Sequence, residues 1–415
     1  SKNLKAVVAA GDSKPKLADP AKIRALVKQA GTDIDENMVS VACGEYGTLV
    51  SMDMGMMLGD VPVKYFTKSV FPVEKVTGEA FRQAYSIKNH ACRGCPVGCG
   101  RLVKNFEVDL DVDGPEYETA AAFGPLCQNT DLDSIVEANH LCNVHGIDTI
   151  SAGVSIAYAL YLYEQGVLTK DDVGMELLWG DSKVILKLVE MIVNREGIGE
   201  ILSQGTLAMA RHFGRDEGEA AQVKGLEMPM HEGRAFHGLA VSYATGPRGA
   251  CHLKGDYYNV DLGNMVAEYG ILPSDRHSSD GKGEFAAKFQ SLKDLFDALT
   301  LCKFAPLTPT RISEFMSAIT GSEWDPERLL AVGDRSLAIK RAISSKRGLT
   351  REHDRLPEIC MRPLDEGNSA DLVPDMDKML RDYYAYRSWD WETGKPSKEK
   401  LLELELNQVA EDFYS

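Results

Sequence analysis

Apolar residues recur every three to four positions along most of this chain, which is the spacing of one face of an α-helix. The pattern predicts helices over residues 21–29, 77–87, 132–145, 153–163, 183–193, 286–300 and 328–343. Asp131 and Asp133 stand before one of these helices as capping residues, and Gly146 and Gly166 supply helix stops. Alternating, strand-like patterns are few and short. We therefore expect a mainly α protein.

The first residues follow a different pattern. Residues 5–10, Lys-Ala-Val-Val-Ala-Ala, predict one short apolar strand, and a lone strand cannot bury its faces without neighbours. We therefore expect an orphan N-terminal strand and a chain that starts in the middle of a fold. The acidic stretch 107–113 alternates Val and Leu with carboxylates, which predicts a half-exposed strand.

Length and composition indicate a folded globular protein. The chain has 415 residues, of which 44% are hydrophobic and 26% charged, enough for two or three domains. Its 62 acidic residues exceed its 46 basic ones, and a net charge of −16 argues against a nucleic-acid partner. The sequence shows neither a signal peptide nor an apolar run long enough for a membrane span, so we expect a cytoplasmic protein without membrane contact.

The cysteines carry the clearest chemical signal. There are nine of them, and an odd number without a secretory signal is better explained by metal ligation than by disulfides. Cys92, Cys95 and Cys99 have the spacing CxxCxxxC, which suits an iron–sulfur cluster, and the interleaved glycines let the loop fold tightly. A cubane cluster needs a fourth ligand from elsewhere. Spacing alone also allows a structural zinc site or three unligated thiols.

Four segments together resemble the tungsten-containing aldehyde ferredoxin oxidoreductase family, and the resemblance runs from the first residue to the last. They are Ser-Lys-Asn-Leu-Lys-Ala-Val at 1–7, the cysteine loop at 92–100, Gly-Pro-Glu-Tyr-Glu-Thr at 114–119 and Gly-Pro-Arg-Gly-Ala-Cys-His at 246–252. Family members carry a pterin-binding β domain before this start. The resemblance implies that residues 1–15 end that missing domain, 16–222 form α-helical domain 2 with the cluster loop, and 223–415 form α-helical domain 3.

The resemblance also implies cofactor ligands. Asp297-Ala-Leu-Thr-Leu-Cys302 resembles the family motif DxxGLC, in which Asp contacts the pterin and Cys completes a 4Fe-4S cluster. The alternative for Cys302 is a buried core cysteine. Thr300 replaces the motif's Gly, and because Thr resists conformations that Gly permits, a sharp turn there implies a different local geometry. Asn143-Val-His-Gly-Ile-Asp148 resembles the pterin motif DxxGxD with Asn143 for Asp; Asp148 is also well placed to cap the next helix.

For catalysis, the resemblance implies tungsten held by two pterins, with molybdenum as the alternative metal. Oxidising an aldehyde to a carboxylic acid needs an acid or base near the metal and a hydrogen-bond donor for the carbonyl oxygen. Glu118 and His252 match the family residues for these tasks. Glu118 is preferred to Glu116, because Glu118 falls at the family's catalytic position. The alternative for Glu116 is an exposed carboxylate at a helix start, and the alternative for His252 is a satisfied core histidine. Arg248 and Lys254 are further cofactor-binding candidates, Arg248 for a pterin phosphate and Lys254 for a carboxylate or a phosphate.

The implied partners follow from this chemistry. They are the N-terminal β domain or subunit, a ferredoxin or iron–sulfur electron-transfer subunit as acceptor, and a small aldehyde or acyl substrate; a homodimer is left open. Two other functions also stay open. One is the tungsten subunit of a reductive enzyme similar to benzoyl-coenzyme A reductase, and the other is a pterin-free iron–sulfur electron-transfer subunit. Asn143 and Thr300, which depart from the family motifs, favour the latter.

Overall fold

The computed structural model describes residues 6–85, 87–105 and 110–415, and most of them lie in helices. The α-helices are α1 (Pro20–Glu36), α2 (Met38–Tyr46), α3 (Ser51–Leu58), α4 (Gly78–Ala84), α5 (Tyr117–Phe123), α6 (Leu132–His145), α7 (Thr149–Glu164), α8 (Lys170–Val173), α9 (Ser182–Asn194), α10 (Gly199–Leu202), α11 (Thr206–His212), α12 (His237–Thr245), α13 (Tyr258–Asp261), α14 (Lys282–Leu299), α15 (Pro309–Thr320), α16 (Pro326–Lys346), α17 (Met376–Arg387), α18 (Lys398–Glu403) and α19 (Asn407–Tyr414). The strands are β1 (Ile87–His90), β2 (Gly100–Asn105), β3 (Leu110–Asp113), β4 (Gln222–Val223) and β5 (Leu226–Glu227).

Every helix that the apolar periodicity predicts is present, as α1, α4, α6, α7, α9, α14 and α16, so the mainly α class is confirmed. Helix α6 begins where the Asp131 carboxylate accepts the backbone N–H groups of Asp133 and Ser134, and it ends at Gly146 with φ of 68°. The prediction for 77–87 runs too far. Helix α4 ends at Ala84 because the Tyr85 backbone is already extended and residues 87–90 form β1, whose backbone pairs with β2.

The described strands form two small antiparallel sheets. In the first, with the order β1-β2-β3, Lys88 lies opposite Leu102, and Leu102 lies opposite Asp113. Of the strand predicted over 107–113, β3 accounts for 110–113, and residues 107–109 lie outside the described residues. The cysteine loop joins β1 to β2, so the sheet anchors both ends of this loop. Strands β4 and β5 pair with each other.

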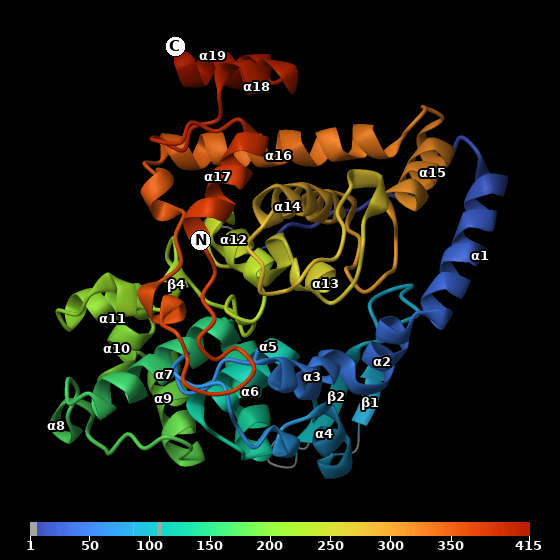
Figure 1. Ribbon diagram of the computed structural model, residues 1–415. Helices are drawn as coiled ribbons and strands as arrows, with labels where there is room; N and C mark the ends of the chain where they lie inside the picture. Colours follow the sequence, from blue (N-terminus) through green and yellow to red (C-terminus); the bar gives the residue numbers. More distant parts are fainter. Residues whose placement is uncertain (1–5, 86, 106–109) are drawn as a thin grey trace.

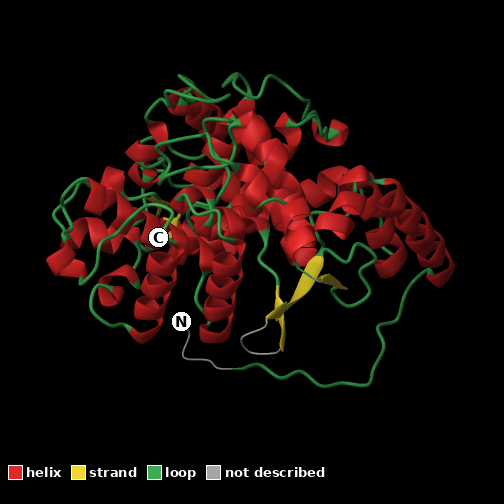
Figure 2. Cartoon of the chain, turned by 90° about the horizontal axis from the view of Figure 1, so that it is seen from below, coloured by secondary structure: helices red, strands yellow, loops and turns green. Residues whose placement is uncertain are grey.

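The predicted N-terminal strand needs a correction. Residues 6–10 are not in a strand, and Val7 and Val8 are 81% and 90% exposed. The physical reason is that a strand exists through its hydrogen-bonded neighbour, and among the described residues this segment has none. Figure 2 shows the described N-terminal residues as a loop along one edge of the molecule, with the three-stranded sheet beside the helices.

The helices form two tiers (Figure 1): α5, α6, α7 and α9 lie in one, and α12, α14, α16 and α17 lie in the other. Glycines allow close packing inside each tier. A Cβ atom at Gly333 of α16 would collide with the Ser291 carbonyl of α14, and one at Gly153 of α7 would collide with Ala122 of α5. One hydrophobic core runs through both tiers, from Leu49 to Trp389. The division at residues 222 and 223 stays a prediction.

No helix in the described part of the chain combines the length and the apolar character that crossing a membrane requires.

Candidate active site

A large open cavity of about 1090 Å³ lies among segments that are far apart in the sequence. Its walls come from the cysteine loop, the first turn of α5, the turn between α6 and α7, the 3-10 helix η5 (His252–Lys254) and the end of α14. Most of the predicted site residues line it, namely Cys92, Cys95, Cys99, Glu118, Asn143, Asp148, His252, Asp297 and Cys302. The fold therefore brings the predicted cluster ligands and the predicted catalytic pair to one place.

The cysteine loop is folded by its glycines and held by a buried arginine. Gly94 and Gly98 have φ of 75° and 61°, and the Cys95 N–H donates to the Cys92 carbonyl at 3.0 Å. The Arg101 side chain is only 5% exposed in total, and its guanidinium donates to the carbonyls of Gly98, Gly100, Cys43 and Gly44 at 2.8 to 3.0 Å. These bonds join the loop to α2. Sequence reasoning missed Arg101, although its place two residues after the third cysteine was a signal.

The four free thiols at the cavity are donors of the kind that an iron–sulfur cluster needs. Cys92 and Cys302 are exposed, Cys95 and Cys99 are half-buried, and all four are free of disulfides. Burial raises the pKa of Cys99, and so do Glu116 and the thiols of Cys302, Cys95 and Cys92. In the part of the chain that the structure describes, no three His, Cys, Asp or Glu side chains surround one point as a mononuclear metal needs. A cubane binds each thiolate at a different iron, so this donor set fits it.

Of the residues predicted to contact the pterin, Asn143, Asp148 and Asp297 line the cavity. Asp148 caps α7 by accepting the Ser151 N–H at 2.8 Å, as its position predicted. Asp297, near the end of α14, forms an ion pair with Lys254, so Lys254 has a carboxylate partner. Arg248 donates to the Cys251 sulfur at 2.7 Å. Among the described residues, Lys254 and Arg248 lie outside the cavity lining.

Thr300 makes the sharp turn at the end of α14. Its φ of 58° and ψ of 36° are left-handed, and its N–H donates to the Asp297 carbonyl at 3.2 Å. The next N–H, of Leu301, reaches the Phe296 carbonyl at 2.8 Å. Thr300 therefore adopts the conformation that a glycine would take more readily, and Cys302 follows immediately after this turn.

Glu118 stands on the first turn of α5 with one oxygen anchored and the other without a hydrogen bond. Its Oε2 accepts the Met230 N–H at 2.8 Å, whereas Oε1 is a buried oxygen with no hydrogen-bond donor among the described residues. Oε1 lies 3.4 Å from Nδ1 of His252 and 3.8 Å from Nε2 of His231. Burial raises the pKa of Glu118, which His231 and the Met230 N–H partly oppose. Burial, Lys303 and His231 hold the pKa of His252 well below its usual range, so this imidazole is neutral near pH 7.

Sequence reasoning missed a second imidazole at the site. His231 is 5% exposed, and its Nδ1 lies 2.6 Å from Oδ2 of Asp60. Its ring is stacked between Tyr117 and Tyr258, with centroid distances of 4.7 and 4.6 Å. Asp60 directly follows Gly59, and this local sequence indicates only a turn. Its partner His231 is 171 positions away in the sequence. No local pattern could have joined the two.

Glu116 is the other candidate for the base. It is the N-cap of α5 and lines the same cavity. Its carboxylate accepts a hydrogen bond from the Thr48 hydroxyl. Burial raises the pKa of Glu116, which Thr48 and Arg101 partly oppose. Unlike Glu118, it contacts neither imidazole in the described contacts.

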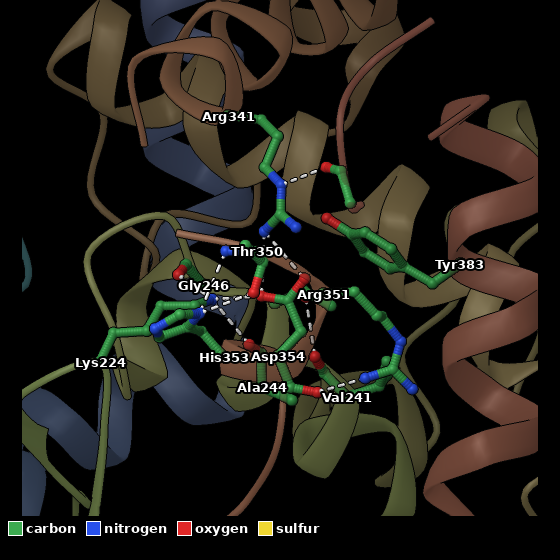
Figure 3. A network of polar contacts seen from close by, with 12 residues as sticks. Lys224, Val241, Ala244, Gly246, Arg341, Thr350, Arg351, His353, Asp354 and Tyr383 are labelled. Carbon is green, nitrogen blue, oxygen red and sulfur yellow. Dashed lines mark hydrogen bonds and ion pairs between the residues drawn. The ribbon is translucent and has the colours of Figure 1, made fainter. Parts of the chain in front are cut away.

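A buried polar network supports the segment that carries His252 (Figure 3). The Lys224 ammonium donates to the carbonyls of Ala244 and Gly246 at 2.8 and 3.0 Å, and it pairs with Asp354 at 2.7 Å. Arg341 pairs with the other oxygen of Asp354 at 2.8 Å. The network fixes the end of α12, from which the chain continues through the Gly-Pro-Arg-Gly turn to His252.

Comparison with known proteins identifies the family of this chain. Residues 25–406 match the family description "Aldehyde ferredoxin oxidoreductase, domains 2 & 3". The chain belongs to this family. It is 34% identical over 412 residues to the tungsten-containing aldehyde ferredoxin oxidoreductase of Pyrococcus furiosus, covering 97% of this chain and 67% of that protein. The same values describe its similarity to the enzyme of Thermococcus kodakarensis. The chain thus spans about two thirds of the length of these family members.

The chain is also similar to a protein with another name, and its fold recurs in a solved structure. The chain is 28% identical over 433 residues to the WOR-like subunit of an aliphatic sulfonate oxidoreductase from Pyrococcus furiosus, covering 99% of this chain and 65% of that subunit. A structure of the active-site complex BamBC of benzoyl-coenzyme A reductase aligns with a TM-score of 0.76 at 20% identity. It covers 96% of this chain and 66% of the other, and it demonstrates a shared fold.

Proposed function

We propose that this chain is the α-helical part of a tungstopterin- and iron–sulfur-dependent oxidoreductase that oxidises aldehydes to carboxylic acids. The observation that carries the proposal is the cavity of about 1090 Å³ in which four free cysteines and the pair of Glu118 and His252 meet. The reaction converts an aldehyde and water into a carboxylic acid, two protons and two electrons. Tungsten held by pterins would supply the redox step, and the protein handles the protons and positions the substrate.

Within this reaction Glu118 acts as the base. Its Oε1 is buried and accepts no hydrogen bond from the described residues, so it is available to take a proton from a water or hydroxyl in the cavity. The Met230 N–H fixes the other oxygen, which sets the direction of Oε1. His252 is neutral near pH 7 and donates a ring N–H to the carbonyl oxygen of the substrate.

An iron–sulfur cluster held by the four cysteines would supply the route for the two electrons. Cys92, Cys95, Cys99 and Cys302 hold a 4Fe-4S cluster in the proposal, and Asn143, Asp148 and Asp297 contact the pterin. Lys254 orients Asp297 through their ion pair, and Arg248 stays a candidate for a pterin phosphate. The acceptor is a ferredoxin or an iron–sulfur partner subunit, and an N-terminal β domain or subunit completes the cofactor site. Asn143 donates and accepts hydrogen bonds without a charge, so it retains a means of contact that Asp would have.

The test measures iron, tungsten and molybdenum in natively purified protein, together with reduction of a one-electron dye by short aldehydes. We expect about four irons per chain and an aldehyde-dependent rate. Glu118→Gln should lower kcat/KM by about 10²–10⁴-fold because it removes the base. Glu116→Gln is the matched control and should change kcat/KM far less, since Glu116 contacts neither imidazole.

Two results would contradict the proposal. Iron without tungsten or molybdenum would favour the pterin-free electron-transfer subunit. A fully loaded protein that is inert to aldehydes, yet passes electrons from reduced dye to benzoyl-coenzyme A, would favour the reductive alternative.

A further inference from the structure

Glu118 has two imidazole neighbours, and their surroundings differ in charge. Its Oε1 lies 3.4 Å from His252 and 3.8 Å from His231. His252 faces this single carboxylate, and the cations Lys303 and Arg248 are close enough to act on it. His231 lies between two carboxylates, with Asp60 on Nδ1 at 2.6 Å and Glu118 on the side of Nε2. An imidazole between two anions gains from binding a second proton, whereas one beside cations does not.

His231 is also the more rigidly held of the two rings. It is stacked between Tyr117 and Tyr258 at 4.7 and 4.6 Å, with interplanar angles of 21° and 18°. Its backbone carbonyl accepts the Tyr243 hydroxyl at 3.1 Å. The residue before it, Met230, provides the N–H that anchors Oε2 of Glu118. One short segment thus holds one oxygen of Glu118 by its backbone and approaches the other by a side chain.

Asp60 is also hydrogen-bonded to the backbone of the segment that contains Met230 and His231. Its Oδ1 accepts the Glu232 N–H at 3.0 Å, and its backbone carbonyl accepts the same N–H at 2.8 Å. Asp60 is 4% exposed, so its interaction with His231 takes place away from bulk water. The carboxylate therefore fixes both the position of His231 and the nitrogen that carries its first proton.

We propose that Asp60 and His231 form a positioning pair that keeps Glu118 in its carboxylate form and aimed into the cavity. Asp60 holds the Nδ1–H of His231, and the doubly protonated ring presents Nε2–H to Oε1 of Glu118. The base is thereby ionised in a buried site that would otherwise favour the neutral acid. This inference rests on the proposed function, because it concerns the base of that reaction.

The charged and titratable groups around His231 are consistent with this role. Burial lowers the pKa of His231, but Asp60 and Glu118 outweigh it, and the net shift is upward in spite of Lys303. Lys303 donates to the Tyr258 hydroxyl at 3.0 Å, which turns that cation toward the tyrosine. Glu232 is engaged by Arg234 at 2.9 Å. Tyr117, Tyr243 and Tyr258 have raised pKa values and stay neutral.

The first test is nitrogen NMR of the 415-residue chain labelled with ¹⁵N-histidine, titrated from pH 5 to pH 9. The His231 signals are identified by their loss in His231→Gln. We expect His231 to remain doubly protonated at pH 7, and Asp60→Asn to lower its proton affinity about tenfold or more, because the opposite charge on Nδ1 is lost. Glu118→Gln should also lower it and serves as a second variant if Asp60→Asn does not fold. His237→Gln, which removes another buried imidazole, should leave the His231 titration unchanged.

The second test is the pH profile of kcat/KM for aldehyde oxidation. If His231 keeps Glu118 ionised, His231→Gln moves the acid limb to higher pH, an effect that a purely structural role would not produce. The proposed positioning pair is overturned if the His231 ring is neutral at pH 7. It is also overturned if His231 titrates in Asp60→Asn and in Glu118→Gln as it does in the wild-type chain. A protein inert to aldehydes whose titration behaves as expected overturns the proposed reaction and leaves the pair standing.

Discussion

Thr300 stands where the family motif has a glycine, and it adopts a left-handed backbone conformation. A β-branched side chain in the left-handed region crowds the backbone, which costs about 1–2 kcal/mol relative to a right-handed conformation. The turn persists because the bonds from the N–H groups of Thr300 and Leu301 close the end of α14. The sequence could anticipate the unusual residue but not how the chain would accommodate it.

We therefore expect Thr300→Gly to stabilise the chain. Relief of the left-handed strain exceeds the entropy that glycine loses on folding, so the free energy of unfolding should rise by about 0.5–1 kcal/mol. Urea unfolding measures the difference. Thr320→Gly, the same change in the last turn of α15, is the control and should destabilise by about 0.3–0.5 kcal/mol. An equal loss of stability in both variants would show that Thr300 is not strained.

At the scale of the element, helices and their caps were predictable, and long-range partners were not. Asp131 and Asp148 begin α6 and α7 from local side-chain chemistry alone. The end of α4 depends on the pairing of β1 with β2, which the local periodicity does not contain. In the site, recognisable motifs gave Glu118, His252 and the cysteines, whereas Asp60 and His231 meet only through the tertiary fold.

The network of Lys224, Asp354 and Arg341 joins the turn between β4 and β5, a loop residue and helix α16, and it leads to a second prediction. Asp354→Asn leaves two buried cations without their shared anion and should cost about 3–5 kcal/mol of unfolding free energy. Asp377→Asn breaks the exposed pair with Arg381 and should change it by about 0.5 kcal/mol or less. Urea unfolding compares the two. Similar small effects would mean that the buried network contributes little.

At the scale of the whole molecule, stability should depend on pH through His237. Its Nδ1 is 3.1 Å from the Ser279 hydroxyl, and its Nε2 is buried without a hydrogen bond from the described residues. Burial, followed by the neighbouring His277, lowers the pKa of His237 to about 4. In the unfolded chain the ring takes up a proton near pH 6.5, so the unfolded state binds more protons between these values. The contribution of His237 to stability is thus complete above that range and is lost as pH falls toward 4.

We expect this group to remove about 1–2 kcal/mol of unfolding free energy between pH 7 and pH 5, after allowance for solvent screening. His237→Gln keeps a polar group but cannot titrate, so its unfolding free energy should fall less over the same interval. The difference between wild type and variant at the two pH values isolates the histidine from the carboxylates. Parallel behaviour of the two proteins would contradict the prediction.

The network of Lys224, Asp354 and Arg341 also connects the C-terminal part of the chain to the cavity. Asp354 contacts the Tyr384 hydroxyl of α17, and Arg341 donates to the Gly394 carbonyl at 2.7 Å. The same Asp354 holds Lys224, which supports the backbone leading to His252. The residues from Asp354 to Gly394 therefore help to hold the cavity wall in place. A chain shortened before residue 354 would keep every cysteine of the cysteine loop and still lose the support of the segment that carries His252.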